Sequence, residues 1–316
     1  MAEVGAARRA RAGAAAATRA AGWSNVARLA RWSAVALAVL VVVGCGEDRP
    51  ASPSLPVAED PGVVHVHGLG INPQNGRVYA ATHTGLFVIG YGTATRVSDR
   101  LQDTMGFTVV GPDQFLGSGH PDFRDKQLYD PARRPLLGLI ESRDAGRSWR
   151  PLSLLGEADF HDLQVAHGRV YGYDATGQRF MTTADRIRWQ VRSTVELVGF
   201  AVSPTDPKVV VATTGRRLLR SADGGRHWQP IQGPNLLVLD WTGPDGLWGI
   251  SPDGQVWRSS DAARTWQRPG RLGGQPEALL VHDQRLYAAV AGQGILSSAD
   301  RGQSWQVQYR QSHQMG

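Results

Sequence analysis

The sequence predicts an all-β protein, a six-bladed β-propeller, from three observations. A short polar turn that ends in Trp recurs as SRDAGRSW, SADGGRHW, SSDAARTW and SADRGQSW, with a shorter copy TADRIRW. The Asp residues of the five copies are 41, 38, 38 and 39 residues apart in chain order. Each interval holds four short apolar runs, and no segment after residue 45 shows sustained helical periodicity. Four strands in a repeat of this length form one propeller blade.

Counting backward from the turns divides the chain into blades. The last four units cover residues 156–194, 195–233, 234–271 and 272–311, and the first copy of the turn lies in the second blade. The segment Val64–Gly90 lacks the turn but aligns with Val195–Ser221 in its strands and its Thr-Gly, so it is the first blade. Six blades result. The second blade is longer because it contains the insert Pro121–Pro135. If this insert forms a blade of its own, the propeller has seven blades.

The repeated turn, SxDxGx(S/T)W, resembles the Asp-box or BNR repeat of sialidases, sortilin-type ectodomains and many bacterial propellers. The resemblance implies a hairpin between the third and fourth strands on the bottom edge, with its Trp packed between neighbouring blades. The Asp side chain can accept N–H bonds of its own turn, and Gly permits a positive φ. The implied role is structural rather than catalytic. The residues of the turn are Ser142, Asp144, Gly146, Trp149, Asp185, Trp189, Ser221, Asp223, Gly225, Trp228, Asp261, Trp266, Ser298, Asp300, Gly302 and Trp305.

The first 44 residues have the layout of a secretory signal peptide. Six Arg residues precede the apolar run Ser33–Val43, which is too short to cross a bilayer comfortably as a helix. The run ends in VVGC, which resembles the bacterial lipobox and implies that Cys45 is lipidated. An ordinary exported protein or an uncleaved anchor is the alternative. Cys45 is the only Cys, so no disulfide can form within the chain.

The expected organisation is a lipoprotein signal peptide (1–44), a lipidated Cys with a flexible Pro- and Ser-rich linker (45–62), the propeller (63–311) and a C-terminal tail (312–316). We expect a monomer that is attached to the membrane by its lipid, on the outer face of the bacterial cell membrane. The net charge of +6 comes from the Arg residues ahead of the apolar run. Beyond residue 44, 28 basic and 27 acidic residues remain, which argues against nucleic-acid binding.

Histidines and acidic residues gather at the starts of the predicted first strands and the ends of the second strands. In a propeller these positions form the top rim of the central channel, where ligands commonly bind. The histidines are His65, His67, His83, His120 and His161. The acidic residues are Asp103, Asp159, Asp162, Glu196 and Glu277.

Three interpretations of this rim compete. Imidazoles with carboxylates suit Zn²⁺ or Cu²⁺, and His65 and His67 would lie on one face of a strand. A pair of the five carboxylates could act as a glycoside hydrolase. The third interpretation is a solvated polar rim that binds a partner, such as a glycan or a protein, or binds nothing tightly. Ligand binding without catalysis is slightly favoured over hydrolysis.

The rim segments HVHGLGINP, THTG and GSGHPD look like those of a group of bacterial lipoprotein propellers that are labelled glycosyl hydrolases. This resemblance covers most of residues 63–310 and implies the fold and a shared site at the rim histidines, but it leaves the reaction open. An Arg-Ile-Pro motif, which a sialidase would carry near its N-terminus, is missing from the sequence. Sialidase activity therefore does not follow from the turns alone.

Overall fold

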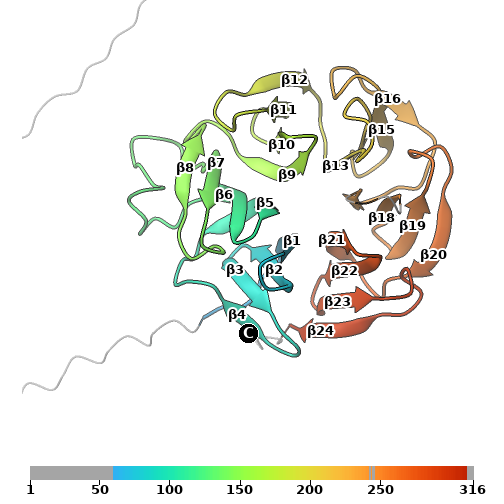
Figure 1. Cartoon of the computed structure of the whole chain (residues 1–316), viewed down its shortest axis with the longest axis horizontal. Helices are drawn as coiled ribbons and strands as arrows, with labels where there is room; N and C mark the ends of the chain where they lie inside the picture. The colour runs from blue at the N-terminus through green and yellow to red at the C-terminus, as the bar shows by residue number, and fades with distance from the viewer. Residues whose placement is uncertain (1–59, 242, 244–245, 312–316) are drawn as a thin grey trace, which may run out of the picture. The chain divides into compact units, whose positions relative to one another are not determined.

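The computed structural model describes residues 60–311 except 242, 244 and 245. Its regular structure consists of six four-stranded antiparallel sheets arranged in a ring around a central channel (Figure 1). The predicted six-bladed β-propeller is therefore confirmed, and the insert Pro121–Pro135 contains turns but no strand. The predicted signal peptide, Cys45, most of the linker and the tail lie outside the described residues.

Each sheet is built from one continuous segment, with its strands in chain order from the channel to the outside. The first three blades consist of β1 (Val66–Asn72), β2 (Arg77–Thr82), β3 (Gly85–Ile89), β4 (Ala94–Arg96), β5 (Asp103–Gly111), β6 (Gln114–His120), β7 (Leu139–Ser142), β8 (Arg150–Ser153), β9 (Phe160–Ala166), β10 (Arg169–Asp174), β11 (Arg179–Thr183) and β12 (Gln190–Thr194). The last three consist of β13 (Gly199–Val202), β14 (Val210–Thr213), β15 (Leu218–Ser221), β16 (Gln229–Ile231), β17 (Val238–Asp240), β18 (Leu247–Ile250), β19 (Gln255–Ser259), β20 (Gln267–Arg271), β21 (Pro276–His282), β22 (Arg285–Val290), β23 (Gly294–Ser298) and β24 (Gln306–Arg310). No helix in this part of the chain is long and apolar enough to span a membrane.

Burial decreases from the second strand of a blade to its fourth strand, and this explains why the second strands are continuous apolar runs in the sequence. The second strands are covered by neighbouring blades on both faces, so β14 (VVAT) is buried throughout and reads as a continuous apolar run. The fourth strands lie at the outer edge, and β12 and β20 have no buried residue. Strands buried on both faces do not show polar–apolar alternation, because neither face meets water.

Six hydrophobic clusters hold the ring together, one at each interface between neighbouring blades. The interface between the first and last blades contains Val66 and Phe87 from one side and Ala289 and Ile295 from the other. The ring is thus closed by side-chain packing rather than by a shared strand.

The repeated turns join the third and fourth strands and share one set of hydrogen bonds. The Ser142 hydroxyl donates to Asp144 Oδ1 (2.8 Å) and accepts the N–H of Gly146 (2.8 Å). Asp144 accepts the backbone N–H (2.9 Å) and the hydroxyl (2.6 Å) of Ser148. The copies at Ser221, Ser259 and Ser298 make the corresponding bonds.

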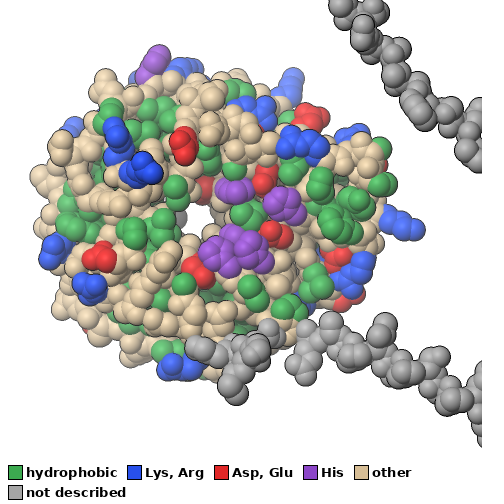
Figure 2. Space-filling model, turned by 180° about the vertical axis from the view of Figure 1, so that it is seen from behind, with side chains coloured by type: hydrophobic (Ala, Val, Ile, Leu, Met, Phe, Trp, Pro, Cys, Tyr) green, Lys and Arg blue, Asp and Glu red, His purple; other side chains and the backbone are tan. Residues whose placement is uncertain are grey.

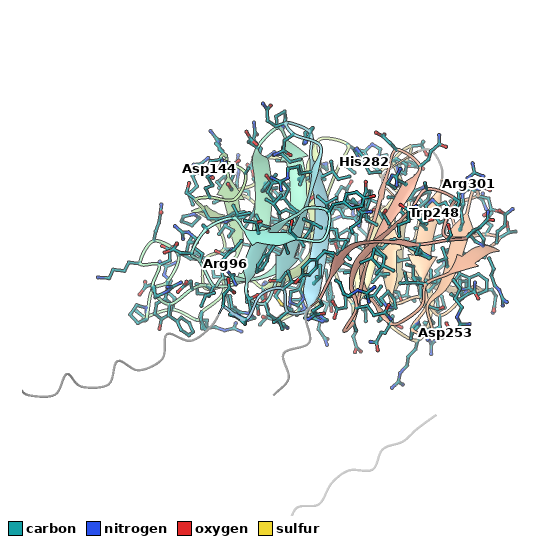
Figure 3. The ribbon with its side chains drawn as sticks, turned by 90° about the horizontal axis from the view of Figure 1, so that it is seen from below. Arg96, Asp144, Trp248, Asp253, His282 and Arg301 are labelled. Carbon is teal, nitrogen blue, oxygen red and sulfur yellow. The ribbon has the colours of Figure 1, made fainter. Side chains whose placement is uncertain are left out.

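The turns lie on one side of the disc. Figure 3 shows Asp144 and Arg301, from two of these turns, on the side opposite Asp253, which lies in a turn between a second and a third strand. The Trp that ends each turn packs against the preceding blade. Trp228, for example, donates its Nε1–H to Ser193 Oγ (2.9 Å) and meets the Phe180 ring edge-on at 5.3 Å.

Candidate functional site

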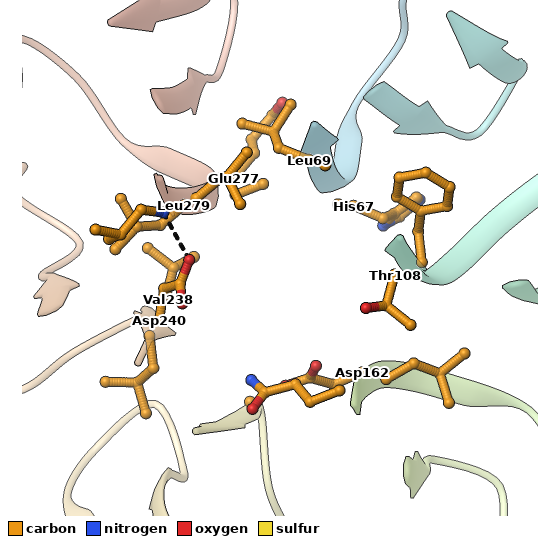
Figure 4. A pocket seen from close by; sticks show the side chains of 18 of the residues that line it. His67, Leu69, Thr108, Asp162, Val238, Asp240, Glu277 and Leu279 are labelled. Carbon is orange, nitrogen blue, oxygen red and sulfur yellow. Dashed lines mark hydrogen bonds between the residues drawn. The ribbon is translucent and has the colours of Figure 1, made fainter. Parts of the chain in front are cut away.

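The central channel is a cavity of about 860 Å³ that is lined by the first strands of all six blades (Figure 4). Its wall is mostly apolar, with Leu69 and Leu279 among the lining side chains. Asp162, Asp240 and Glu277 are among the residues that line the channel. No Lys or Arg is among the described lining residues. Among the described lining residues, acidic side chains therefore outnumber Lys and Arg.

In four of the six blades, the pairing between the first and second strands is interrupted by a shift in register. The register shifts fall at His67 in β1, Met105 in β5, His161 in β9 and Glu277 in β21. A β-bulge leaves one residue unpaired and redirects its side chain. The strands β13 and β17 pair without such a shift. Three of the four bulge residues are rim residues that the sequence predicted.

A compact group of side chains consists of His65, His67, His83 and Asp103. His67 Nε2 lies 3.2 Å from His83 Nδ1 and 3.4 Å from Asp103 Oδ1, and His83 Nδ1 lies 3.0 Å from the same oxygen. His65, His67 and His83 can each place one nitrogen within 4.8 Å of the others. His65 has a φ of +42°, a left-handed conformation that is uncommon for a residue other than Gly.

The group continues around the rim in both directions. His120 places Nδ1 3.3 Å from Asp103 Oδ2 and Nε2 3.6 Å from Asp159 Oδ2. The same oxygen of Asp159 lies 2.9 Å from His161 Nε2.

On the other side, His65 Nδ1 lies 3.0 Å from Glu277 Oε1, and Glu277 also accepts the N–H of Val66. Figure 2 shows histidines clustered with acidic residues beside the channel opening. Five imidazoles and three carboxylates thus form one continuous arc, which we call the rim arc: His65, His67, His83, Asp103, His120, Asp159, His161 and Glu277.

The rim arc perturbs the pKa values of its own members. Burial lowers the pKa of His67, and the neighbouring His83 and His65 lower it further. Burial alone would raise the pKa of Asp103, but hydrogen bonds from His120 and His67 hold it well below its usual range. The hydrogen bond to Asp103 raises the pKa of His120. Asp103 is therefore a carboxylate, and His67 is a neutral imidazole, at neutral pH.

Two candidate acids lie apart from the rim arc. Asp162 lies on the channel wall, where Oδ2 accepts the N–H of Phe200 (2.9 Å). Burial together with the charge of Asp240 raises the pKa of Asp162 to about 7. Asp240 in turn accepts the N–H of Val281 (2.7 Å). Each of these two carboxylates thus links its blade to the next. Glu196 is exposed before β13 and does not line the channel.

The structure therefore brings together eight of the ten predicted rim residues and separates Asp162 and Glu196 from them. Asp240 and Met105 also line the channel, although neither was predicted from the sequence. An acidic residue inside an otherwise apolar first-strand run was the available signal for Asp240. For Met105 there was none, because its place on the channel wall follows from a bulge in β5.

No protein-family model matches the chain, and no curated protein matches it in sequence. Among solved structures, a gluconolactonase from Xanthomonas campestris is similar at 15% identity with a TM-score of 0.54, covering 72% of this chain and 83% of that one. The extracellular domain of a hybrid two-component system from B. thetaiotaomicron is similar at 10% identity with a TM-score of 0.52, covering 79% of this chain. A GH74 xyloglucanase, also from Xanthomonas campestris, gives 16% identity, a TM-score of 0.44 and coverage of 75% of this chain.

The matched region spans only 33% of the two-component system domain and 44% of the xyloglucanase. At these identities the similarity concerns the β-propeller fold, and folds of this kind carry many unrelated functions.

Proposed function

We propose that the protein is a binding β-propeller whose ligand is a divalent transition metal, Zn²⁺ or Cu²⁺, held by His65, His67, His83 and Asp103. The observation that carries this proposal is the triangle of His67 Nε2, His83 Nδ1 and Asp103 Oδ1, with edges of 3.0, 3.2 and 3.4 Å. Ligand atoms about 2.0–2.1 Å from a tetrahedral Zn²⁺ lie about 3.3–3.4 Å from one another. The triangle therefore has nearly the dimensions of one face of such a site.

The surroundings of the triangle support the same ligand set. Histidine ligands usually donate their second ring N–H to a carboxylate, which fixes the orientation of the ring. Glu277 occupies that place for His65, since it lies 3.0 Å from Nδ1 and leaves Nε2 for a metal. The left-handed φ of His65 is the kind of local strain that clusters at ligand sites.

Hydrolysis of glycosides fits the rim less well. A glycosidase needs two carboxylates placed on either side of a bond. Of the five candidates, Asp103, Asp159 and Glu277 are paired with imidazoles, and Asp162 holds the backbone of the next blade. We therefore retain binding without catalysis as the proposed function.

Metal content of the full chain, purified without an affinity tag, tests this proposal. Elemental analysis should find Zn or Cu in the wild-type protein, or bound Zn²⁺ after its addition and dialysis. His67→Ala/His83→Ala should contain one equivalent fewer because it removes two corners of the triangle. His227→Ala is the matched control, since this exposed His lies in a repeated turn and its ring pairs, among residues 60–311 that the structure describes, only with Asp223. Unchanged metal content in the double variant would contradict the proposal.

We further propose that the protein is an exported lipoprotein anchored through Cys45. The basic residues, short apolar run and VVGC of the sequence support this placement. Cys45→Ser should move the protein from the membrane fraction to the soluble fraction, because it removes the acceptor of the lipid. Fractionation and immunoblotting would measure the shift, with wild type beside it. A Cys45→Ser variant that still sediments with membranes would contradict the lipoprotein assignment.

We also propose that the repeated turns are Asp-boxes in the BNR sense. The support is their shared Ser–Asp hydrogen bonds and their common place between third and fourth strands. Their position on the side of the disc away from the rim arc fits a structural role.

A further inference from the structure

We propose that the rim arc holds a second divalent metal ion, bound by His120, Asp159 and His161 and coupled to the first through Asp103. This inference rests on the proposed function and extends it from one ion to two. It concerns residues that form no part of the first ligand set. The chemistry of the donors, two imidazole nitrogens and one carboxylate, suits the same class of ion, Zn²⁺ or Cu²⁺.

Asp159 is the centre of the second group. Its Oδ2 lies 2.9 Å from His161 Nε2 and 3.6 Å from His120 Nε2, so the carboxylate faces two imidazole nitrogens at once. The side chain of Asp159 is only 7% exposed. Its other oxygen, Oδ1, is buried and has no hydrogen-bond partner in the described structure. A buried carboxylate oxygen without a partner is costly, and a cation supplies one.

Asp103 connects the two groups through its two oxygens. Oδ1 lies 3.0 Å from His83 and 3.4 Å from His67, whereas Oδ2 lies 3.3 Å from Nδ1 of His120. The contact with Asp103 orients the His120 ring and leaves Nε2 for the second ion. Asp103 is therefore a ligand of the first ion and a positioning residue for a ligand of the second.

The charge of the rim arc can accommodate two cations. Asp103, Asp159 and Glu277 contribute three negative charges, and every ion pair that they make in the described part of the chain is with a histidine. No Lys or Arg within the described residues lines the adjoining channel. One divalent ion leaves the arc net negative when the imidazoles are neutral, and a second reverses the sign. Both ions reach the arc from solvent, because His83, His120 and His161 are each more than a third exposed.

The test is the stoichiometry of Zn²⁺ binding to the full chain, by calorimetric titration of metal-stripped protein and by elemental analysis after dialysis. Wild type should bind two equivalents. His120→Ala/His161→Ala and His67→Ala/His83→Ala should each bind one, and His227→Ala should bind two. Asp103→Asn should weaken both steps, the second by about tenfold or more, which is typical when a residue that orients a ligand is lost. The thermal transition of each stripped variant should match that of stripped wild type, which controls for folding.

Each other outcome has a definite meaning. One equivalent in wild type, lost in His67→Ala/His83→Ala and kept in His120→Ala/His161→Ala, would overturn the second site and leave the proposed function standing. Two equivalents retained in His120→Ala/His161→Ala would place the second ion elsewhere and overturn this inference. No binding to wild type would overturn both proposals. If His120→Ala/His161→Ala folds poorly, His120→Gln/His161→Gln preserves side-chain bulk and gives the same comparison.

Discussion

Replacing Trp149 with Ala is expected to lower the free energy of unfolding by about 3–5 kcal/mol, the usual cost of truncating a buried Trp. Trp149 ends the first repeated turn and is 4% exposed. It packs in the cluster that joins the first two blades, with Phe115 and Leu86 among its members, and its ring lies directly over Gly117. Because the neighbouring strands are fixed by their own sheets, the space left by the ring cannot close fully.

Urea denaturation followed by fluorescence or circular dichroism would measure the loss. Tyr91→Ala is the control, since Tyr91 is 82% exposed and its removal should change stability by no more than about 0.5 kcal/mol. A Trp149 variant as stable as the Tyr91 variant would show that packing of Trp149 does not stabilise the interface between the first two blades.

Gly225→Ala is the second substitution with a large expected effect. Gly225 has a φ of +83°, and a Cβ at this position would overlap the ring of Phe180 in the preceding blade. The left-handed backbone alone costs an L-residue about 1–2 kcal/mol, and the steric overlap adds about 1–3 kcal/mol. We therefore expect a loss of about 2–5 kcal/mol in the free energy of unfolding.

The repeat supplies its own matched control at Gly302. This residue has nearly the same φ, +86°, but its Cβ would lie 3.2 Å from Val256, where the neighbour can yield. Gly302→Ala should therefore cost only the backbone part, about 1–2 kcal/mol. Ala263 occupies the corresponding position of another copy with a φ of +67°, so the turn itself tolerates a methyl group. Equal losses in the two Gly variants would contradict the steric argument.

The fold was open to prediction because the turn repeats at a nearly constant interval. Four runs of apolar residues in each interval fixed the strand count, and the segment Val64–Gly90 could be assigned by alignment although it lacks the turn. The insert Pro121–Pro135 left the number of blades ambiguous, since sequence does not show whether a turn-rich segment forms a sheet of its own. The structure resolves this ambiguity in favour of six sheets.

The site was predictable only as a set of positions. Strand starts and strand ends located the rim, but the β-bulges at His67, His161 and Glu277 decide which way these side chains point. A bulge depends on how two strands pair, which one strand's sequence does not specify. The same limit explains Asp162, which shares a strand with His161 but points into the channel to bind the next blade.

Each sheet of the ring is made from one continuous stretch of chain, and within the part of the chain that the structure describes no strand is exchanged between the first and last blades. The unit that repeats along the gene and the unit that repeats in space therefore have the same boundaries. A duplication or deletion of one such unit adds or removes a whole sheet and changes the circumference of the ring by a whole step. In a ring whose closing sheet combined strands from two distant segments, the same event at the closure would leave two incomplete sheets with unpaired edges. Here the architecture lets the number of blades change without any intermediate that exposes a broken sheet.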